Sequence, residues 1–170
     1  MADPPWVHSR NIKRIAIVGG THGNEAIGVA LARHFLRHPE LVRRPSFDVD
    51  VLLHNLDAID KNVRYVEEDL NRCYYLKDLN NAERKMTLEA VRAKEVNSLL
   101  GPKGSMPRTD LCIDLHTTTA NTGVALMMPP KDELSHAIGA HLLAHDASVR
   151  LVNFTAGKVC VCGYHQPQTN

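Results

Sequence analysis

The chain has 170 residues, a length that suits one domain with its own hydrophobic core. Hydrophobic residues make up 44% of it and charged residues 23%, with a formal net charge of +1, as is ordinary for a globular protein. The sequence has no long basic run of the kind that binds nucleic acid or an anionic membrane surface, and no apolar run of membrane-spanning length.

Residues 1–10 contain acidic and proline residues but no apolar core, so we expect no secretory signal there. The cysteines are then expected to be reduced thiols in a cytoplasmic protein; they are Cys73, Cys112, Cys160 and Cys162. The last two stand too close together for the usual zinc knuckle.

The first regular elements are a short strand and a helix joined by a glycine-rich turn. Residues 15–18 are mostly β-branched and apolar and end at two glycines, which predicts a buried strand. Residues 25–37 have the apolar spacing of a helix. The apolar side chains expected to share one face of it are Ile27, Leu31 and Phe35.

His22 and Glu25 lie in the turn between that strand and that helix. This turn is at the carboxyl end of the strand, where open α/β sheets place their ligands. An imidazole and a carboxylate three residues apart suit zinc. The glycines do not follow the dinucleotide-binding pattern, and Glu25 would repel a pyrophosphate. The alternative is a loop histidine beside a glutamate favoured by the helix dipole.

The rest of the chain alternates between predicted strands and helices. Strands are predicted over 47–53, 111–115, 124–128, 149–154 and 159–161, helices over 88–100 and 134–144, and a loop over 54–64. This alternation predicts an α/β fold with a mainly parallel or mixed sheet.

His116 directly follows the strand predicted over 111–115. If that strand is a neighbour of the first, His116 reaches His22 and Glu25, and three ligands leave the open fourth position of a catalytic zinc site. Asp114 lies two residues earlier, on the same face, and could accept the second N–H of the histidine. The alternative is a pair of polar residues that end a strand.

The segment Asp69-Leu70-Asn71-Arg72, with Arg64 before it, supplies two arginines in a loop. Because guanidinium groups grip carboxylates at two points, one arginine could bind a substrate carboxylate and the other an oxyanion. The alternative is that both are exposed and paired with Glu67 or Glu68.

The remaining histidines carry weaker signals. His141 and His145 have the i, i+4 spacing of a metal-binding pair, although solvated helix faces often have it too. Sequence identifies no partner for His8, His54 or His165.

Three motifs in register resemble the aspartoacylase family, which includes the aminoacylase that acts on N-acyl aromatic amino acids. They are G-G-T-H-G-N-E at 19–25, D-L-N-R at 69–72 and D-L-H-T-T-T at 114–119, and residues 92–103 resemble a helix of the family and its end. The resemblance runs from about residue 15 to about residue 128.

The resemblance implies a zinc-carboxypeptidase-like three-layer α/β/α fold and hydrolysis of N-acyl amino acids. His22, Glu25 and His116 would be the ligands of one zinc ion per chain. Arg64 would be catalytic, facing the scissile carbonyl, and would bind substrate together with Asn71 and Arg72. The expected organisation is an N-terminal arm (1–13), a partial catalytic domain (14–162) and a tail (163–170).

The sequence departs from the family after His116. The general-base glutamate of the family has no counterpart except Glu133, which is expected at a helix start, and the C-terminal part of the fold is expected to be missing. The alternative function is therefore a catalytically weak or silent zinc-binding form that acts through protein association. A zinc carboxypeptidase is the enzymatic alternative, and an unpaired sheet edge would allow a homo-oligomer.

Overall fold

The computed structural model describes residues 12–104, 106 and 108–153. These residues form two compact units, 12–117 and 118–153. The predicted domain limits at residues 14 and 162 stay a prediction, and the second of them lies outside the described residues, as does the strand predicted over 159–161.

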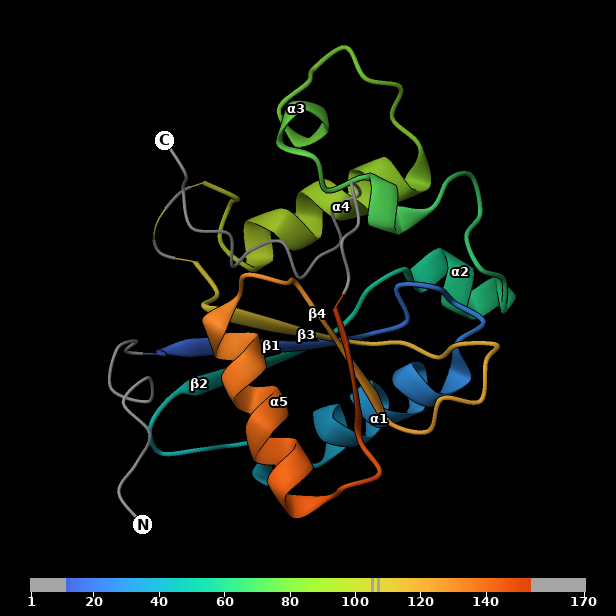
Figure 1. The fold of residues 1–170 in the computed structure, drawn as a ribbon. Helices are drawn as coiled ribbons and strands as arrows, with labels where there is room; N and C mark the ends of the chain where they lie inside the picture. Colours follow the sequence, from blue (N-terminus) through green and yellow to red (C-terminus); the bar gives the residue numbers. More distant parts are fainter. Residues whose placement is uncertain (1–11, 105, 107, 154–170) are drawn as a thin grey trace. The chain divides into compact units, whose positions relative to one another are not determined.

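The unit of residues 12–117 is built on a parallel sheet with the strand order β2-β1-β3 (Figure 1). Its elements are β1 (Arg14–Gly19), α1 (Ala26–Arg37), β2 (Asp48–Leu53), α2 (Leu56–Lys61), α3 (Leu76–Leu79), α4 (Leu88–Leu99) and β3 (Leu111–Leu115), with short 3-10 helices η1 (Pro39–Leu41) and η2 (Leu70–Arg72). The parallel α/β arrangement expected from the sequence is therefore confirmed.

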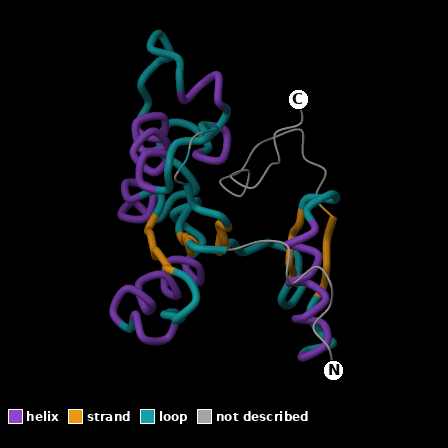
Figure 2. Tube along the Cα trace, turned by 90° about the vertical axis from the view of Figure 1, so that its left-hand side faces the viewer, coloured by secondary structure: helices purple, strands orange, loops and turns teal. Residues whose placement is uncertain are grey.

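Helices cover the two faces of this sheet, α1 on one side and α4 on the other (Figures 1 and 2). Because successive side chains of a strand point to opposite faces, Ala16 and Val18 of β1 turn together toward the α4 side. There they join a buried cluster with residues of η2, α3 and α4, among them Leu70, Ala93 and Val96. This core fixes η2 and α4 against the central strand.

Helix α1 approaches the sheet very closely at Gly28. A Cβ atom at this position would lie 2.2 Å from the backbone oxygen of Leu115, so only glycine allows the contact. The residues that the helix buries are Gly28, Val29 and Ala32. Ile27 and Leu31 of the expected apolar face are instead 65% and 39% exposed. The helix turns the face that carries Gly28 and Ala32 to the sheet, because these small residues allow the close contact.

The loop predicted over residues 54–64 is wrong in part, since α2 lies within it. Asn55 begins this helix by accepting a hydrogen bond from the backbone N–H of Ala58 at 3.3 Å. Asn62 ends it in the left-handed region, with φ of 52°. The six residues of α2, three of them charged, form a segment too short for a periodic pattern to reveal a helix.

The unit of residues 118–153 contains β4 (Ala125–Met128), α5 (Glu133–His145) and β5 (Arg150–Asn153). The two strands pair in parallel and the helix connects them (Figure 2). The three elements agree to within one residue with those predicted over 124–128, 134–144 and 149–154, although residue 154 lies outside the described residues. Asp132 caps the helix by accepting from the N–H of Ser135, and Glu133 lies in its first turn as expected. Among the described residues, no helix has the length and apolar character needed to cross a membrane.

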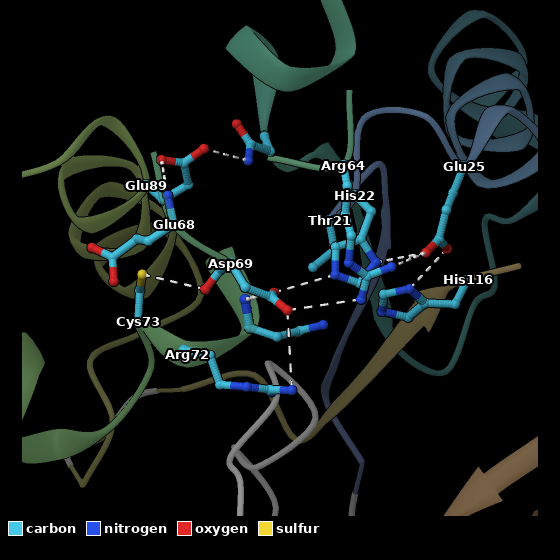
Figure 3. A network of polar contacts seen from close by, with 12 residues as sticks. Thr21, His22, Glu25, Arg64, Glu68, Asp69, Arg72, Cys73, Glu89 and His116 are labelled. Atoms are coloured by element: carbon cyan, nitrogen blue, oxygen red, sulfur yellow. Dashed lines mark hydrogen bonds and ion pairs between the residues drawn. The ribbon is translucent and has the colours of Figure 1, made fainter. Parts of the chain in front are cut away.

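A buried carboxylate holds the segment before η2 in place. Glu89, in the first turn of α4, is fully buried and accepts backbone N–H bonds from Val66 (2.7 Å), Glu67 (3.2 Å) and Glu68 (3.3 Å). It also accepts from the side chain of Asn55 at 3.2 Å (Figure 3). Burial raises the pKa of Glu89, but these donors outweigh it and lower the pKa below its ordinary value.

We expect Glu89→Ala to lower the free energy of unfolding by more than about 3 kcal/mol, because it leaves several buried donors without an acceptor at about 1–3 kcal/mol each. Urea denaturation measures the change. The matched control is Glu95→Ala on the same helix, whose side chain is 55% exposed and pairs with Arg92, and which should cost no more than about 0.5 kcal/mol. Equal losses in the two variants would contradict this role of Glu89.

Candidate active site

The carboxyl ends of the three parallel strands each lead into a histidine. His54 and His116 directly follow β2 and β3, and His22 lies three residues after β1. The register pairs Gly19 with Leu115, so the segments after β1 and β3 start side by side. The two strands are therefore neighbours, which was the condition for His116 to reach the turn that carries His22.

The carboxylate of Glu25 bridges two of these histidines. Its Oε1 lies 2.6 Å from Nδ1 of His22, and its Oε2 lies 2.9 Å from Nδ1 of His116 (Figure 3). Oε2 also accepts the backbone N–H of Thr117 at 2.6 Å. Glu25 stands at the start of α1, so the close contact of that helix with the sheet sets the position of its carboxylate.

His22, Glu25 and His116 could hold a metal ion. Each offers one ligand atom, and these atoms lie within 4.8 Å of one another. His22 and Glu25 are buried, with exposed fractions of 3% and 8%. Two imidazole nitrogens and one carboxylate oxygen are a donor set that suits zinc and leaves a fourth position open.

A second carboxylate stands behind each histidine. Nε2 of His116 lies 2.9 Å from Oδ2 of Asp114, as predicted, and Nε2 of His22 lies 3.2 Å from Oδ1 of Asp69. An ionised carboxylate only accepts, so each Nε2 carries a hydrogen. Each Nδ1 faces an oxygen of Glu25 instead, so a bound metal would take the place of a hydrogen at Nδ1 while Nε2 keeps its carboxylate partner, an arrangement typical of metal-binding histidines.

The local charges shift the pKa values of these groups. Burial lowers the pKa of His116, but the hydrogen bond and charge of Asp114 and the charge of Glu25 outweigh it and raise the pKa to about 9. Burial raises the pKa of Glu25, but the N–H of Thr117 and the charge of His116 lower it below its ordinary value. Both carboxylate and imidazole are thus held in their charged forms by one another.

Arg64 lies at the open side of this cluster. Its Nη1 is 3.7 Å from Oε1 of Glu25 and its Nη2 is 3.7 Å from Oδ2 of Asp69. No ion pair joins it to Glu67 or Glu68 among the residues that the structure describes. Because its side chain is 52% exposed, most of its donors remain available to a ligand.

The 3-10 helix η2 presents Asn71 and Arg72 next to Asp69. Asp69 accepts the backbone N–H of Asn71 at 3.0 Å, and Nη2 of Arg72 lies 4.0 Å from its Oδ2. The side chain of Arg72 is 43% exposed. Asn71 is buried, and its Oδ1 has no hydrogen-bond partner in the described part of the chain. Within the described part of the chain, both side chains therefore keep polar atoms that could bind a ligand.

The structure brings all six predicted site residues into one region of the unit of residues 12–117. They are His22, Glu25, Arg64, Asn71, Arg72 and His116. Their roles as metal ligands, catalytic group and substrate-binding groups stay predictions.

Sequence reasoning missed two residues of this region, Thr21 and His54. Oγ1 of Thr21 lies 2.8 Å from Nδ1 of His54 and 2.9 Å from Oδ1 of Asp114. Burial lowers the pKa of His54 to about 4, so its imidazole is neutral at pH near 7. The available signal was its position directly after a strand, the same position that identified His116.

Two of the four cysteines lie within the described residues. Cys73 and Cys112 are buried free thiols, in agreement with the expectation of reduced cysteines. Cys160 and Cys162 lie outside the described residues, as does His165.

Comparison with known proteins gives consistent matches. The sequence model of the succinylglutamate desuccinylase/aspartoacylase catalytic domain matches residues 11–158. A probable aspartoacylase of Trichodesmium erythraeum is 39% identical over 142 residues, which cover 84% of this chain and 48% of that protein. The N-acyl-aromatic-L-amino acid amidohydrolase (carboxylate-forming) of Homo sapiens is 42% identical over 135 residues, covering 79% and 41%.

The fold has a close counterpart among solved structures. The crystal structure of murine aminoacylase 3 matches with a TM-score of 0.80 and 37% identity, over 89% of this chain and 52% of that chain. This chain therefore spans about half the length of the relatives that it matches. Since the domain match covers most of the 170 residues, the chain belongs to the succinylglutamate desuccinylase/aspartoacylase family.

Proposed function

We propose that this chain carries the metal centre and the substrate-carboxylate site of a zinc-dependent hydrolase that deacylates N-acyl amino acids. The observation that carries the proposal is the convergence of His22, Glu25 and His116 on one point beside two half-exposed arginines. The relatives named aspartoacylase and N-acyl-aromatic-L-amino acid amidohydrolase support this choice of substrate class.

His22, Glu25 and His116 would hold the zinc ion through Nδ1, one carboxylate oxygen and Nδ1. When bound, zinc polarises a carbonyl and lowers the pKa of a water ligand to about 7. Asp69 and Asp114 keep the hydrogens of both imidazoles on Nε2 and so leave each Nδ1 as the ligand atom.

The two arginines would divide the binding of the substrate between them. Arg64 lies next to Glu25, so its guanidinium is placed to stabilise negative charge that develops on the acyl oxygen. Arg72 and Asn71 lie farther along η2 and would fix the carboxylate of the amino acid, with Arg72 supplying a two-point grip.

We also propose a cytoplasmic location, supported by the free thiols Cys73 and Cys112. A small-molecule N-acyl amino acid is the proposed partner, and a homo-oligomer stays a prediction.

The test is a substrate screen of the zinc-loaded chain with N-acetylaspartate, N-acetyl aromatic amino acids and short peptides. Release of free amino acid from the N-acyl compounds would support the proposal. Cleavage of peptides alone would instead indicate a zinc carboxypeptidase. Zinc binding without any turnover would favour the alternative of a catalytically silent zinc-binding protein.

The first prediction concerns the metal. We expect about one zinc per chain, the stoichiometry of a three-ligand site. His22→Ala, Glu25→Ala and His116→Ala should each weaken zinc binding by more than the roughly 10–100-fold typical of outer-shell partners, because each removes a ligand atom. Elemental analysis and competition with a chelator measure the effect.

The control for these variants is His34→Ala, which removes an exposed histidine of α1 whose ring lies next to that of His38. It should bind zinc as the wild type does. If the triple variant of the three ligands keeps its zinc, the site lies elsewhere, and Cys160, Cys162 and His165 are the next residues to replace.

A second prediction concerns pH. A proton on Nδ1 of His116 competes with zinc, and the pKa of this residue is raised to about 9. The apparent zinc affinity should therefore rise with pH across the neutral range, by up to about tenfold per pH unit for one displaced proton. Calorimetric titrations from about pH 6 to about pH 7.5 measure the slope. A flat profile would show that no proton leaves when zinc binds.

A third prediction concerns the substrate carboxylate. Arg72→Lys keeps the charge but loses the planar fork, so the Kd of N-acetylaspartate and of N-acetyl aromatic amino acids should rise about tenfold or more. The zinc content should not change. Arg43→Lys, at an exposed position outside the site, is the control and should leave the Kd unchanged. Wild-type affinity in Arg72→Lys would remove Arg72 from the substrate site.

A further inference from the structure

A hydrogen-bonded series runs inward from His116 to the end of β2. Asp114 accepts from Nε2 of His116 at 2.9 Å, and Oγ1 of Thr21 lies 2.9 and 3.0 Å from the two oxygens of Asp114. Nδ1 of His54 lies 2.8 Å from the same Oγ1. Thr21 and His54 have exposed fractions of 1% and 0%, and the side chain of Asp114 is 2% exposed.

The number of hydrogens fixes the direction of each bond. Asp114 is ionised and only accepts, so the single hydroxyl hydrogen of Thr21 points to it. Oγ1 of Thr21 can then only accept from His54, which places a hydrogen on Nδ1 of His54. In the opposite tautomer, Nδ1 of His54 would accept the hydroxyl hydrogen of Thr21. Oγ1 of Thr21 and the carboxylate of Asp114 would then face each other without a hydrogen between them. Only one arrangement of hydrogens therefore gives every contact of the series a donor and an acceptor.

His54 is held rigidly in this arrangement. Its ring stacks on Tyr74 with centroids 6.1 Å apart and an angle of 26°. Its backbone oxygen accepts from Nε of Arg92 at 2.6 Å, and its backbone N–H donates to Gly19 at 3.0 Å. Nε2 of His54 is buried without a hydrogen-bond partner in the described part of the chain. Burying a polar atom without a partner is unfavourable, and an apolar side chain would avoid this. The favourable polar contact of the imidazole is therefore the one that its Nδ1–H makes with Thr21.

We propose that Thr21 and His54 are positioning residues of the metal centre. The N–H of His54 orients the Thr21 hydroxyl, and the hydroxyl holds the carboxylate of Asp114. That carboxylate keeps a hydrogen of His116 on Nε2, so that Nδ1 is the nitrogen that gives up its proton to bind zinc. This inference rests on the proposed function in one respect, namely that His116 is a zinc ligand.

The experiment compares the zinc affinity of four variants of the full chain. Thr21→Val removes the hydroxyl and keeps the shape, and it should weaken zinc binding by about tenfold or more, within the range of outer-shell partners. Thr21→Ser keeps the hydroxyl and should bind zinc nearly as the wild type does. His54→Leu should weaken binding in the same direction, and His54→Asn, whose amide can donate from the position of Nδ1, should restore most of the affinity.

Two further measurements separate positioning from folding. Thermal unfolding of each variant shows whether it is folded at the temperature of the titration. Imidazole ¹⁵N NMR of the metal-free wild type should show His54 as the neutral Nδ1–H tautomer, a result that does not depend on zinc. The Nε2–H tautomer or a protonated ring would overturn the inference.

The outcomes also separate this inference from the proposed function. A wild-type chain that binds no zinc would overturn the proposed function and the inference with it. A folded Thr21→Val that binds zinc as tightly as the wild type would overturn the inference alone. Weak binding in Thr21→Val with recovery in Thr21→Ser would support it.

Discussion

The repulsion among three buried carboxylates is the constraint on which this site depends. The side chains of Glu25, Asp69 and Asp114 are 10%, 18% and 2% exposed. Glu25 contacts both His22 and His116, whereas Asp69 contacts only His22 and Asp114 only His116 among them. Burying like charges is costly unless positive charge compensates them. The arginines nearby lie 3.7–4.0 Å away and are about half exposed, so they compensate only in part. In the metal-free chain the charged imidazole of His116, between Asp114 and Glu25, supplies further positive charge. A cation bound by the two Nδ1 atoms and Glu25 would replace the proton on Nδ1 of His116 and compensate the same carboxylates.

The parallel sheet brings these charged groups together. Parallel strands place all their carboxyl ends at one edge, so the residues that follow β1, β2 and β3 meet there although they are far apart in sequence. For this reason the sequence was enough to predict the three strands, and to predict that His116 reaches His22 if the first and third of them are neighbours. The strands are rich in apolar residues, many of them β-branched, and that pattern is local. The resemblance to the aspartoacylase family added the roles of Arg64, Asn71 and Arg72.

The parts that sequence did not predict depend on contacts that no local pattern records. The side chain that contacts His54 is Thr21, 33 residues away. The backbone N–H groups that donate to Glu89 lie 21–23 residues earlier in the chain. Whether a buried histidine is a core residue or a member of a polar series depends on which hydroxyl or carboxylate lies opposite it. The buried face of α1 was also not predicted, because two of its three buried residues are Gly28 and Ala32, whose small size matters only where the helix contacts the sheet. Helix α2 is short and begins and ends at asparagines, which are also typical of loops.

The segment Asp69-Leu70-Asn71-Arg72 joins the two halves of the proposed chemistry within one turn of 3-10 helix. The side chain of Asp69 contacts His22. The side chain of Arg72, three residues later, lies beside the carboxylate of Asp69 and is 43% exposed. Leu70 is fully buried in the core and fixes the turn between them. Residues 66–68, just before this segment, are held by Glu89, which accepts hydrogen bonds from their three backbone N–H groups. A shift of η2 would therefore move two groups together, namely the carboxylate that contacts the proposed metal ligand His22 and the arginine proposed to bind the substrate carboxylate.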